Sequence, residues 1–473
     1  MTVSEELRAC FAGAADFEER CITAGGAAVS VFFLDGLTSG ADLADFVLRP
    51  LKEQLLPGTP EELYRQAASG VVRCAVCSSA ADAGTAAEKL VNGNCALYFE
   101  GCERFLCFEV KGGDRRGPSA PESENTVKGA KDAFTETVRT NTALIRRHLR
   151  TPKLRLWQTT VGTRSLTNVT LLYIEDLTDP ALVSRMQERL KSIRIDGLIS
   201  PSAVEEYVTG SRRTAFPLLE YTERTDKFCQ GLLAGRIGLL VDGLPLGYLA
   251  PVTLAKLMES QEDRAVDYVS ASCLRVLRYA ALFISLLLPA LYAAMAMFHQ
   301  EMLPTRLLLA IIESKKDVPF PTILEVLGIL AAFELLQEAG LHLPQAIGTA
   351  VSIIGGLVVG TAAVDAKLIS PAALIVAASS GICGFTLPSR DLSDAVRVWR
   401  FALTMLAGAA GLFGVTMGLL LLIVHLAGLS SFGIAYLSPF SGARTGHALL
   451  RERLCKQKYR DAELHPTDRR NQA

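Results

Sequence analysis

Hydrophobic residues are distributed unevenly along this chain. In residues 1–265 short apolar runs alternate with helix-like amphipathic stretches, whereas residues 274–440 contain long runs without any charge. A bilayer core about 30 Å thick needs roughly 20 apolar residues in a helix. The uncharged runs therefore predict four membrane-spanning helices, near 279–298, 346–364, 368–387 and 401–424.

A further apolar segment, at 319–340, is interrupted by Glu325, Glu334 and Glu338. A carboxylate at mid-bilayer costs on the order of 3 kcal/mol, so the pattern predicts an amphipathic or re-entrant segment. Three interpretations are open. The glutamates can be solvated on an interfacial helix, they can form ion pairs with other helices, or Glu325 or Glu334 can form an acidic ring along a cation path in an oligomer.

Small residues recur at a spacing of four in two of the predicted spans. One stripe contains Gly348, Ser352, Gly356 and Gly360, and a second contains Gly414 and Gly418. Such stripes allow helix backbones to approach closely in lipid. We predict that they pack helices, either within the chain or between subunits.

The first 265 residues contain a weak internal duplication. Residues 32–38 resemble residues 172–178, and residues 93–101 resemble residues 235–243. Both comparisons have an offset of about 140 residues, and each pairs an apolar run with an acidic turn. The repeat predicts two α/β subdomains of related design, at 1–111 and 135–262. Residues 112–134, rich in Gly, Pro, Ser and charge, predict a linker.

The predicted fold class is thus a cytosolic α/β domain of two subdomains followed by an all-α transmembrane domain. The helical domain occupies 263–440, and a basic tail occupies 441–473. Basic residues flank both ends of the helical domain, which predicts that both termini are cytoplasmic. An even number of crossings is then required, and four spans satisfy it.

Composition and motifs argue against several classes of function. The formal net charge is -1, so no electrostatic case for nucleic-acid binding arises. The chain lacks the GxxxxGK[ST], HExxH and GxSxG motifs, and its six histidines lack ligand spacing. We predict no catalytic residue, cofactor or metal, and hence no enzyme. Cys74 and Cys77 form a lone CxxC that could join Cys95, Cys102 and Cys107 in a zinc site, but ordinary thiols are the favoured interpretation.

Basic residues also gather in one predicted helix of the second subdomain. They are Arg139, Arg146, Arg147, His148 and Arg150. The cluster is typical of a solvated helix face. Contact with anionic lipid headgroups or with an acidic neighbour would also account for it.

The sequence resembles the GerA family of spore germination proteins over nearly its whole length. The most specific stretch is Phe298-His-Gln-Glu-Met-Leu-Pro-Thr305, followed by Val318-Pro-Phe-Pro321 and Phe333-Glu-Leu-Leu-Gln-Glu-Ala-Gly340. Residues 141–147 (Asn-Thr-Ala-Leu-Ile-Arg-Arg) and 431–439 also fit. The chain departs from the family pattern at Arg224-Thr-Asp226, where the family commonly has Arg-Pro-Asp.

The resemblance implies a germinant-receptor A subunit in the spore inner membrane. Such a subunit is expected to assemble with B and C subunits, to contact membrane lipids, and to form a homo-oligomer that passes monovalent cations when a nutrient germinant binds. SpoVAF-type paralogs, which work with the dipicolinic-acid release machinery, resemble the chain as well. The sequence is also compatible with a component of a small-molecule transporter or with a membrane-anchored scaffold.

Overall fold

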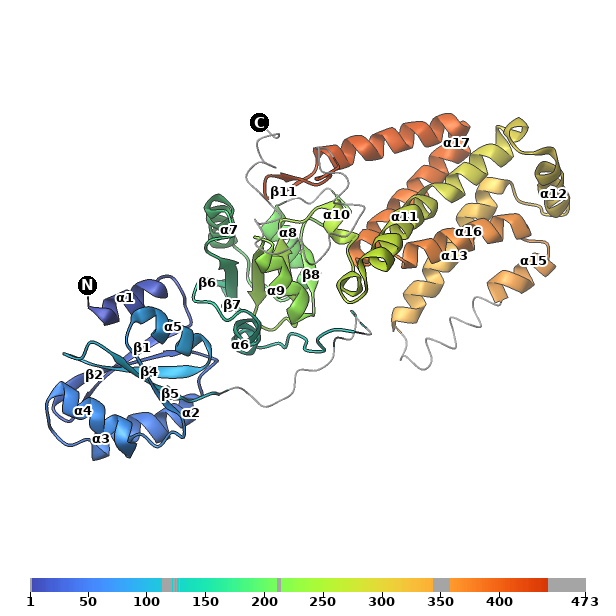
Figure 1. Ribbon diagram of the computed structural model, residues 1–473. Helices are drawn as coiled ribbons and strands as arrows, with labels where there is room; N and C mark the ends of the chain where they lie inside the picture. The colour runs from blue at the N-terminus through green and yellow to red at the C-terminus, as the bar shows by residue number, and fades with distance from the viewer. Residues whose placement is uncertain are drawn as a thin grey trace. The chain divides into compact units, whose positions relative to one another are not determined.

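A computed structural model describes residues 2–112, 121, 124, 126, 128–210, 214–342 and 358–440. The described chain forms two compact units. The α/β unit contains the residues up to 210 together with Leu219–Pro251, and the helical unit contains 214–218 and the residues from Val252 onwards (Figure 1). The predicted fold class, an α/β half followed by a helical half, is therefore confirmed.

The first subdomain of the α/β unit is a five-stranded sheet covered by helices on both faces. The strands lie in the order β1-β2-β4-β5-β3 and pair antiparallel. Side chains of β2 alternate between two cores: Val29 and Val31 pack on one face, and Phe32 and Leu34 on the other. Its elements are α1 Val3–Cys10, β1 Phe17–Ala24, β2 Ala27–Leu34, α2 Gly40–Asp42, η1 Leu43–Leu48, α3 Arg49–Gln54, α4 Pro60–Gln66, η2 Ala67–Val71, β3 Cys77–Ala80, α5 Ala83–Val91, β4 Asn94–Phe99 and β5 Phe105–Glu109.

The second subdomain repeats this architecture, which confirms the predicted duplication. Its sheet has the order β6-β7-β9-β10-β8, the same order strand for strand. The register is also the same: Val29 faces Phe99 in the first copy, and Val169 faces Val241 in the second. The elements are α6 Val138–His148, β6 Leu154–Val161, β7 Thr167–Ile174, α7 Pro180–Ser192, α8 Pro201–Thr209, β8 Glu220–Thr222, α9 Thr225–Leu233, β9 Ile237–Val241 and β10 Gly247–Ala250.

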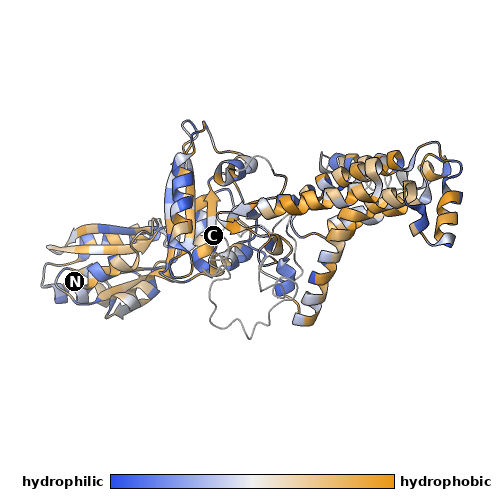
Figure 2. Cartoon of the chain, turned by 90° about the horizontal axis from the view of Figure 1, so that it is seen from above, coloured by the Kyte–Doolittle hydropathy of each residue, from blue (hydrophilic) through white to orange (hydrophobic). Residues whose placement is uncertain are grey.

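The helical unit is built around two long apolar helices, α11 and α17. Both are long and apolar enough to cross a membrane. The hydropathy colouring separates this unit clearly from the mixed α/β unit (Figure 2). The elements are α10 Leu254–Leu257, η3 Gln261–Arg264, α11 Tyr268–Met297, η4 Gln300–Met302, α12 Thr305–Lys315, α13 Thr322–His342, η5 Val358–Ala362, α15 Ala363–Asp365, α16 Pro371–Phe385, α17 Arg390–Gly428, β11 Ser430–Ser431 and β12 Ile434–Ala435.

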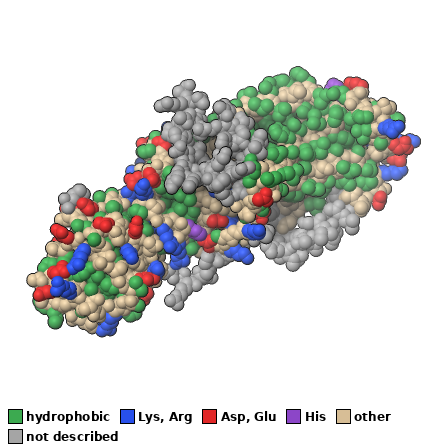
Figure 3. Space-filling view, in the orientation of Figure 1, with side chains coloured by type: hydrophobic (Ala, Val, Ile, Leu, Met, Phe, Trp, Pro, Cys, Tyr) green, Lys and Arg blue, Asp and Glu red, His purple; other side chains and the backbone are tan. Residues whose placement is uncertain are grey.

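The face of the helical unit seen in Figure 3 is largely hydrophobic. Large side chains such as Phe283, Phe413 and Val424 are more than half exposed. Contiguous apolar surface of this kind is typical of contact with lipid or with another protein. Charged side chains are spread over the α/β unit and gather at one end of the helical unit (Figure 3).

The helices differ in extent from the predicted spans. Helix α11 begins before the predicted span 279–298, because Asp267 caps it by accepting hydrogen bonds from the backbone N–H groups of Val269 and Ser270. Segment 319–340 forms one regular helix of 21 residues, α13. The predicted span 368–387 contains the shorter α16. Most of the predicted span 346–364 lies outside the described residues.

Helix α17 consists of two arms that fold back on one another. Ala410 and Gly411 leave the helical conformation, and Gly411 has φ +60° and ψ −141°, a conformation that favours glycine. A Cβ atom placed on Gly414 would lie 2.0 Å from the carbonyl oxygen of Leu406. In a straight helix those residues are two turns apart, about 12 Å. The chain therefore reverses at this turn, and the predicted span 401–424 lies across it (Figure 1).

Candidate functional site

Glu325 lies in the first turn of α13 and is buried. Its Oε2 accepts a hydrogen bond from Ser370 Oγ at 2.7 Å and another from the Ser370 backbone N–H at 3.3 Å. Ser370 also caps α16, so this carboxylate joins the starts of two helices. The ammonium of Lys315 lies 3.6 Å from Oε1. Glu325 is thus charge-compensated within one chain.

Glu334 lies two to three turns further along α13 and faces the first arm of α17. Its carboxylate accepts hydrogen bonds from Arg397 Nη1 at 3.0 Å and Arg400 Nη2 at 2.7 Å. Arg400 is buried and also donates to Ser380 Oγ at 3.3 Å. Ser380 in turn donates to the Ser285 carbonyl at 2.8 Å. This polar chain links α13, α17, α16 and α11.

Glu338 differs from the other two glutamates because it is exposed. Of the three interpretations of the acidic helix, the geometry within one chain corresponds to ion pairs with other helices for Glu325 and Glu334. Paired carboxylates cost less to bury than isolated ones. A role of Glu325, Glu334 and Glu338 in an ion path stays a prediction.

The small-residue stripes are described only in part. Gly348, Ser352 and Gly356 lie outside the described residues, and Gly360 lies in η5. Gly414 and Gly418 face the first arm of α17 within the same chain: a Cβ on Gly418 would lie 2.5 Å from Leu403 Cδ2. Gly414 and Gly418 therefore allow the two arms of α17 to pack against each other within one chain.

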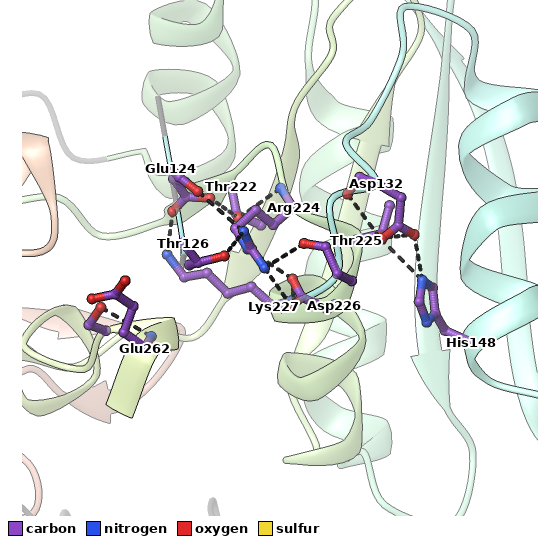
Figure 4. A network of polar contacts seen from close by, with 12 residues as sticks. Glu124, Thr126, Asp132, His148, Thr222, Arg224, Thr225, Asp226, Lys227 and Glu262 are labelled. Atoms are coloured by element: carbon purple, nitrogen blue, oxygen red, sulfur yellow. Dashed lines mark hydrogen bonds and ion pairs between the residues drawn. The ribbon is translucent and has the colours of Figure 1, made fainter. Parts of the chain in front are cut away.

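A polar network in the second subdomain was not predicted from the sequence (Figure 4). Its centre is the buried Arg224, which forms a bidentate ion pair with Asp226 through bonds of 3.0 and 2.8 Å. Arg224 also donates to Thr126 Oγ1 and to the Ala130 carbonyl. The end of the predicted linker 112–134 is thereby fixed to the start of α9.

The same network extends to a histidine on α6. Asp132 Oδ2 lies 2.6 Å from His148 Nε2 and accepts a hydrogen bond from Thr225 Oγ1, also at 2.6 Å. The hydrogen bond from His148 lowers the pKa of Asp132 to about 2, and the same contact raises the pKa of His148. A proline at position 225, which the resemblance led us to expect, could not make this side-chain bond.

A buried carboxylate lies beside this network, at Glu220. It forms ion pairs with Arg236 at 2.6 Å and Lys227 at 3.1 Å. Burial works to raise the pKa of Glu220, but the two positive charges outweigh it and lower the pKa to about 2. Lys227 also contacts Glu124, at 2.8 Å.

The predicted basic cluster on α6 is not a uniform solvated face. Arg146 is buried and forms a bidentate ion pair with Asp16 of the first subdomain, through bonds of 2.7 and 2.8 Å. Arg139 pairs with Asp35, also of the first subdomain. Contact with an acidic neighbour therefore holds for these two residues, and the partner is the duplicate subdomain itself.

The cysteines give no support for a zinc site. Among the described residues, no group of three or more His, Cys, Asp or Glu side chains is placed to hold a metal ion. Cys95 and Cys107 are buried, and burial raises the pKa of both thiols. They pack as small apolar side chains.

Together the units define a two-part protein: a duplicated α/β domain and an apolar helical domain suited to a membrane. The model of the Bacillus/Clostridium GerA spore germination protein family matches residues 5–463. The chain therefore belongs to the GerA family.

Relatives of known name agree with this assignment. The chain is 36% identical to the uncharacterized membrane protein YfkQ of Bacillus subtilis, over 87% of this chain and 80% of that protein. It is also 36% identical to spore germination protein A1 of Bacillus subtilis, over 77% and 76% of the two chains. Identity to stage V sporulation protein AF of the same organism is 31%, over 81% and 78%. These names describe membrane, germination and sporulation proteins.

The chain is also similar to a domain whose structure has been solved. It is the N-terminal domain of the A subunit of the Bacillus megaterium spore germinant receptor GerK3, 27% identical to this chain. The match covers 52% of this chain and 92% of that one, with a TM-score of 0.41.

Proposed function

We propose that this chain is the A subunit of a germinant receptor in the spore inner membrane. In this proposal it acts with B and C subunits in the response to nutrient germinants, and its helical unit oligomerises among membrane lipids into a path for monovalent cations. The observation that carries the proposal is the acidic helix α13 inside the apolar helical unit of a GerA-family chain. Carboxylates at such positions mark ion pathways in membrane proteins.

The fold-back of α17 bears on how the helices cross the membrane. We infer that its two arms, about 30 Å and about 25 Å long at 1.5 Å per residue, cross as a pair. Helix α13 is about 31 Å long by the same measure, and its first two glutamates are paired, so it can cross as well. With α11, α16 and the predicted span 346–364, six crossings result. Six is even, which keeps both termini on the cytoplasmic side.

The test is ion release from spores that carry this chain with its partner subunits. We expect Glu325→Gln or Glu334→Gln to slow the release of potassium after nutrient is added, when release is compared at equal amounts of the protein in the inner membrane. Glu313→Gln is the matched control, because Glu313 is an exposed glutamate on α12. Release unchanged by both α13 variants would remove these residues from the ion path.

The similarity to stage V sporulation protein AF supports a second candidate, an accessory germination protein of that type. The two candidates differ in the trigger that depends on the chain. If the chain is a receptor subunit, we expect its deletion to abolish the response to one nutrient and to leave release by a non-nutrient trigger unchanged. If the chain is an accessory protein, we expect its deletion to slow release after every trigger.

A further inference from the structure

The carboxylate of Glu325 is satisfied at one oxygen and not at the other. Its side chain is 0% exposed. Oε2 accepts both hydrogen bonds from Ser370, whereas Oε1 receives no hydrogen bond from any described residue. A buried carboxylate oxygen without a donor is costly unless a positive charge lies beside it.

Neutral oxygens also lie near this carboxylate. The Tyr292 hydroxyl on α11 is buried close to Ser370 and Glu325, and it forms no hydrogen bond of normal geometry with a described residue. The Ser370 hydroxyl lies on the other oxygen of the same carboxylate. The buried Thr322 hydroxyl, one turn before Glu325, accepts a hydrogen bond from Lys315. Three hydroxyls and one carboxylate are thus gathered at the starts of α13 and α16.

The positive charge at this site is the ammonium of Lys315, which the carboxylate holds only loosely. It lies 3.6 Å from Oε1, beyond hydrogen-bond distance, and its side chain is 28% exposed. Lys315 is the last residue of α12, a helix with no fully buried residue. A lysine ammonium is a compact monovalent cation on a flexible four-carbon stem. To leave the site, Lys315 gives up its ion pair with Glu325 and its hydrogen bond to Thr322, and α12 exposes no buried side chain when it moves.

We propose that Glu325, Tyr292, Thr322 and Ser370 form a binding site for a small monovalent cation, and that the Lys315 ammonium occupies this site as a tethered competitor. A single carboxylate with neutral oxygens favours a monovalent ion, because divalent cations bind where more carboxylates or waters are supplied. Movement of α12 that withdraws Lys315 opens the site. This inference names residues that would bind the ion in the proposed ion path. The binding site itself does not depend on that proposal, whereas a role of the bound ion in conduction does.

The test measures binding without requiring conduction. Lys315→Met removes the tethered charge and keeps a similar length. In the purified full-length protein, we expect the unfolding temperature of this variant to rise with KCl or NaCl. It should not rise with N-methyl-D-glucamine chloride at the same ionic strength. A tenfold excess of cation over its Kd multiplies the folded-to-unfolded ratio about elevenfold. The wild type should respond much less, and Lys315→Met/Glu325→Gln should not respond.

Three results would overturn the site. They are a Lys315→Met variant that small cations do not stabilise, a response of equal size to N-methyl-D-glucamine, and a response that persists without the Glu325 carboxylate. Stabilisation of Lys315→Met by acid alone would likewise show that Glu325 takes a proton instead of a metal cation. If Lys315→Met does not fold, Lys315→Gln, which keeps a polar group near Thr322, is measured in the same way.

A second measurement uses the wild-type chain and needs no variant. If a small cation displaces the Lys315 ammonium, reductive methylation of Lys315 should become faster in KCl than in N-methyl-D-glucamine chloride. The neighbouring, exposed Lys316 is the internal control. An unchanged ratio of the two labelling rates would contradict the proposal. A positive result with normal ion release from Glu325→Gln spores would instead reject the ion path and keep the site.

Discussion

Because Glu334 forms ion pairs with Arg397 and Arg400, we expect its neutralisation to lower the stability of the helical unit, apart from any effect on ion transport. In Glu334→Gln, Arg397 keeps Asp394 as a partner at 2.7 Å. Arg400, whose side chain is 4% exposed, keeps one described hydrogen bond, to Ser380 at 3.3 Å. Removing one partner of a buried ion pair costs about 3–5 kcal/mol. Because the Glu334 side chain is 26% exposed, the low end of about 3 kcal/mol applies.

The assay can follow the helical unit alone. The chain has two tryptophans, Trp157 in the α/β unit and Trp399 in α17, next to Arg400. In a Trp157→Phe background, Trp399 fluorescence therefore reports unfolding around the ion pair. For a unit of this size 1 kcal/mol shifts the unfolding temperature by about 2–4 °C. We expect Glu334→Gln to lower it by roughly 6–12 °C in detergent.

A double variant separates charge from stability. Glu334→Gln/Arg400→Met removes the unpaired guanidinium, and replacing a buried pair by uncharged groups is often neutral. It should therefore recover most of the lost stability. The reasoning would be refuted if Glu334→Gln were as stable as the wild type. It would also be refuted if the double variant lost as much stability as Glu334→Gln and Arg400→Met lose together. Where stability returns and ion release does not, the carboxylate itself is needed for the ion.

Other contacts give further predictions. Gly414→Ala places a methyl group 2.0 Å from the Leu406 carbonyl oxygen, so we expect it to destabilise the protein by about 1–3 kcal/mol. Gly381→Ala is the control, because the space around Gly381 is open. Equal unfolding temperatures for the two variants would contradict the fold-back of α17. The raised pKa of His148 means that its bond to Asp132 stabilises fully below about pH 6.5 and is lost as pH rises through the folded pKa. His148→Gln should therefore lose stability relative to the wild type at pH 6 and approach it at pH 9 in thermal unfolding, and a difference constant with pH would refute this.

The sequence predicted the elements whose signals are local. Residues 32–38 and 172–178 could be identified as strand ends because an apolar run meets an acidic turn within a few positions. The duplication then followed from the offset alone, and the structure adds the shared strand order and register. Apolar length also predicted α11, although its beginning depends on the cap at Asp267 rather than on hydrophobicity.

The ion pairs could not be predicted, because their partners are distant in the sequence. Arg146 lies 130 positions from Asp16, and Glu334 lies 66 positions from Arg400. A basic cluster or an acidic helix shows that charge exists and does not show what neutralises it. The turn in α17 was missed for a different reason. Hydropathy does not register a positive φ, so the apolar residues around Gly411 are indistinguishable from a continuous span.

The two subdomains share their topology and differ at the residues that join them. The residue before β1 is Asp16, which binds Arg146 of the second copy; the residue before β6 is Lys153, which binds Asp176 of its own copy. Similarly, Asp35 pairs with α6 of the second copy, whereas its equivalent, Glu175, pairs with Arg155 within its own copy. A third copy would dock on the residues of the second copy that correspond to Asp16 and Asp35. One of these residues, Lys153, has the opposite charge, and the other, Glu175, is already paired with Arg155. The terminal repeats of a repeat protein have a polar outer face. The ion pairs of Asp16 and Asp35 with the second copy therefore make the junction specific to two copies.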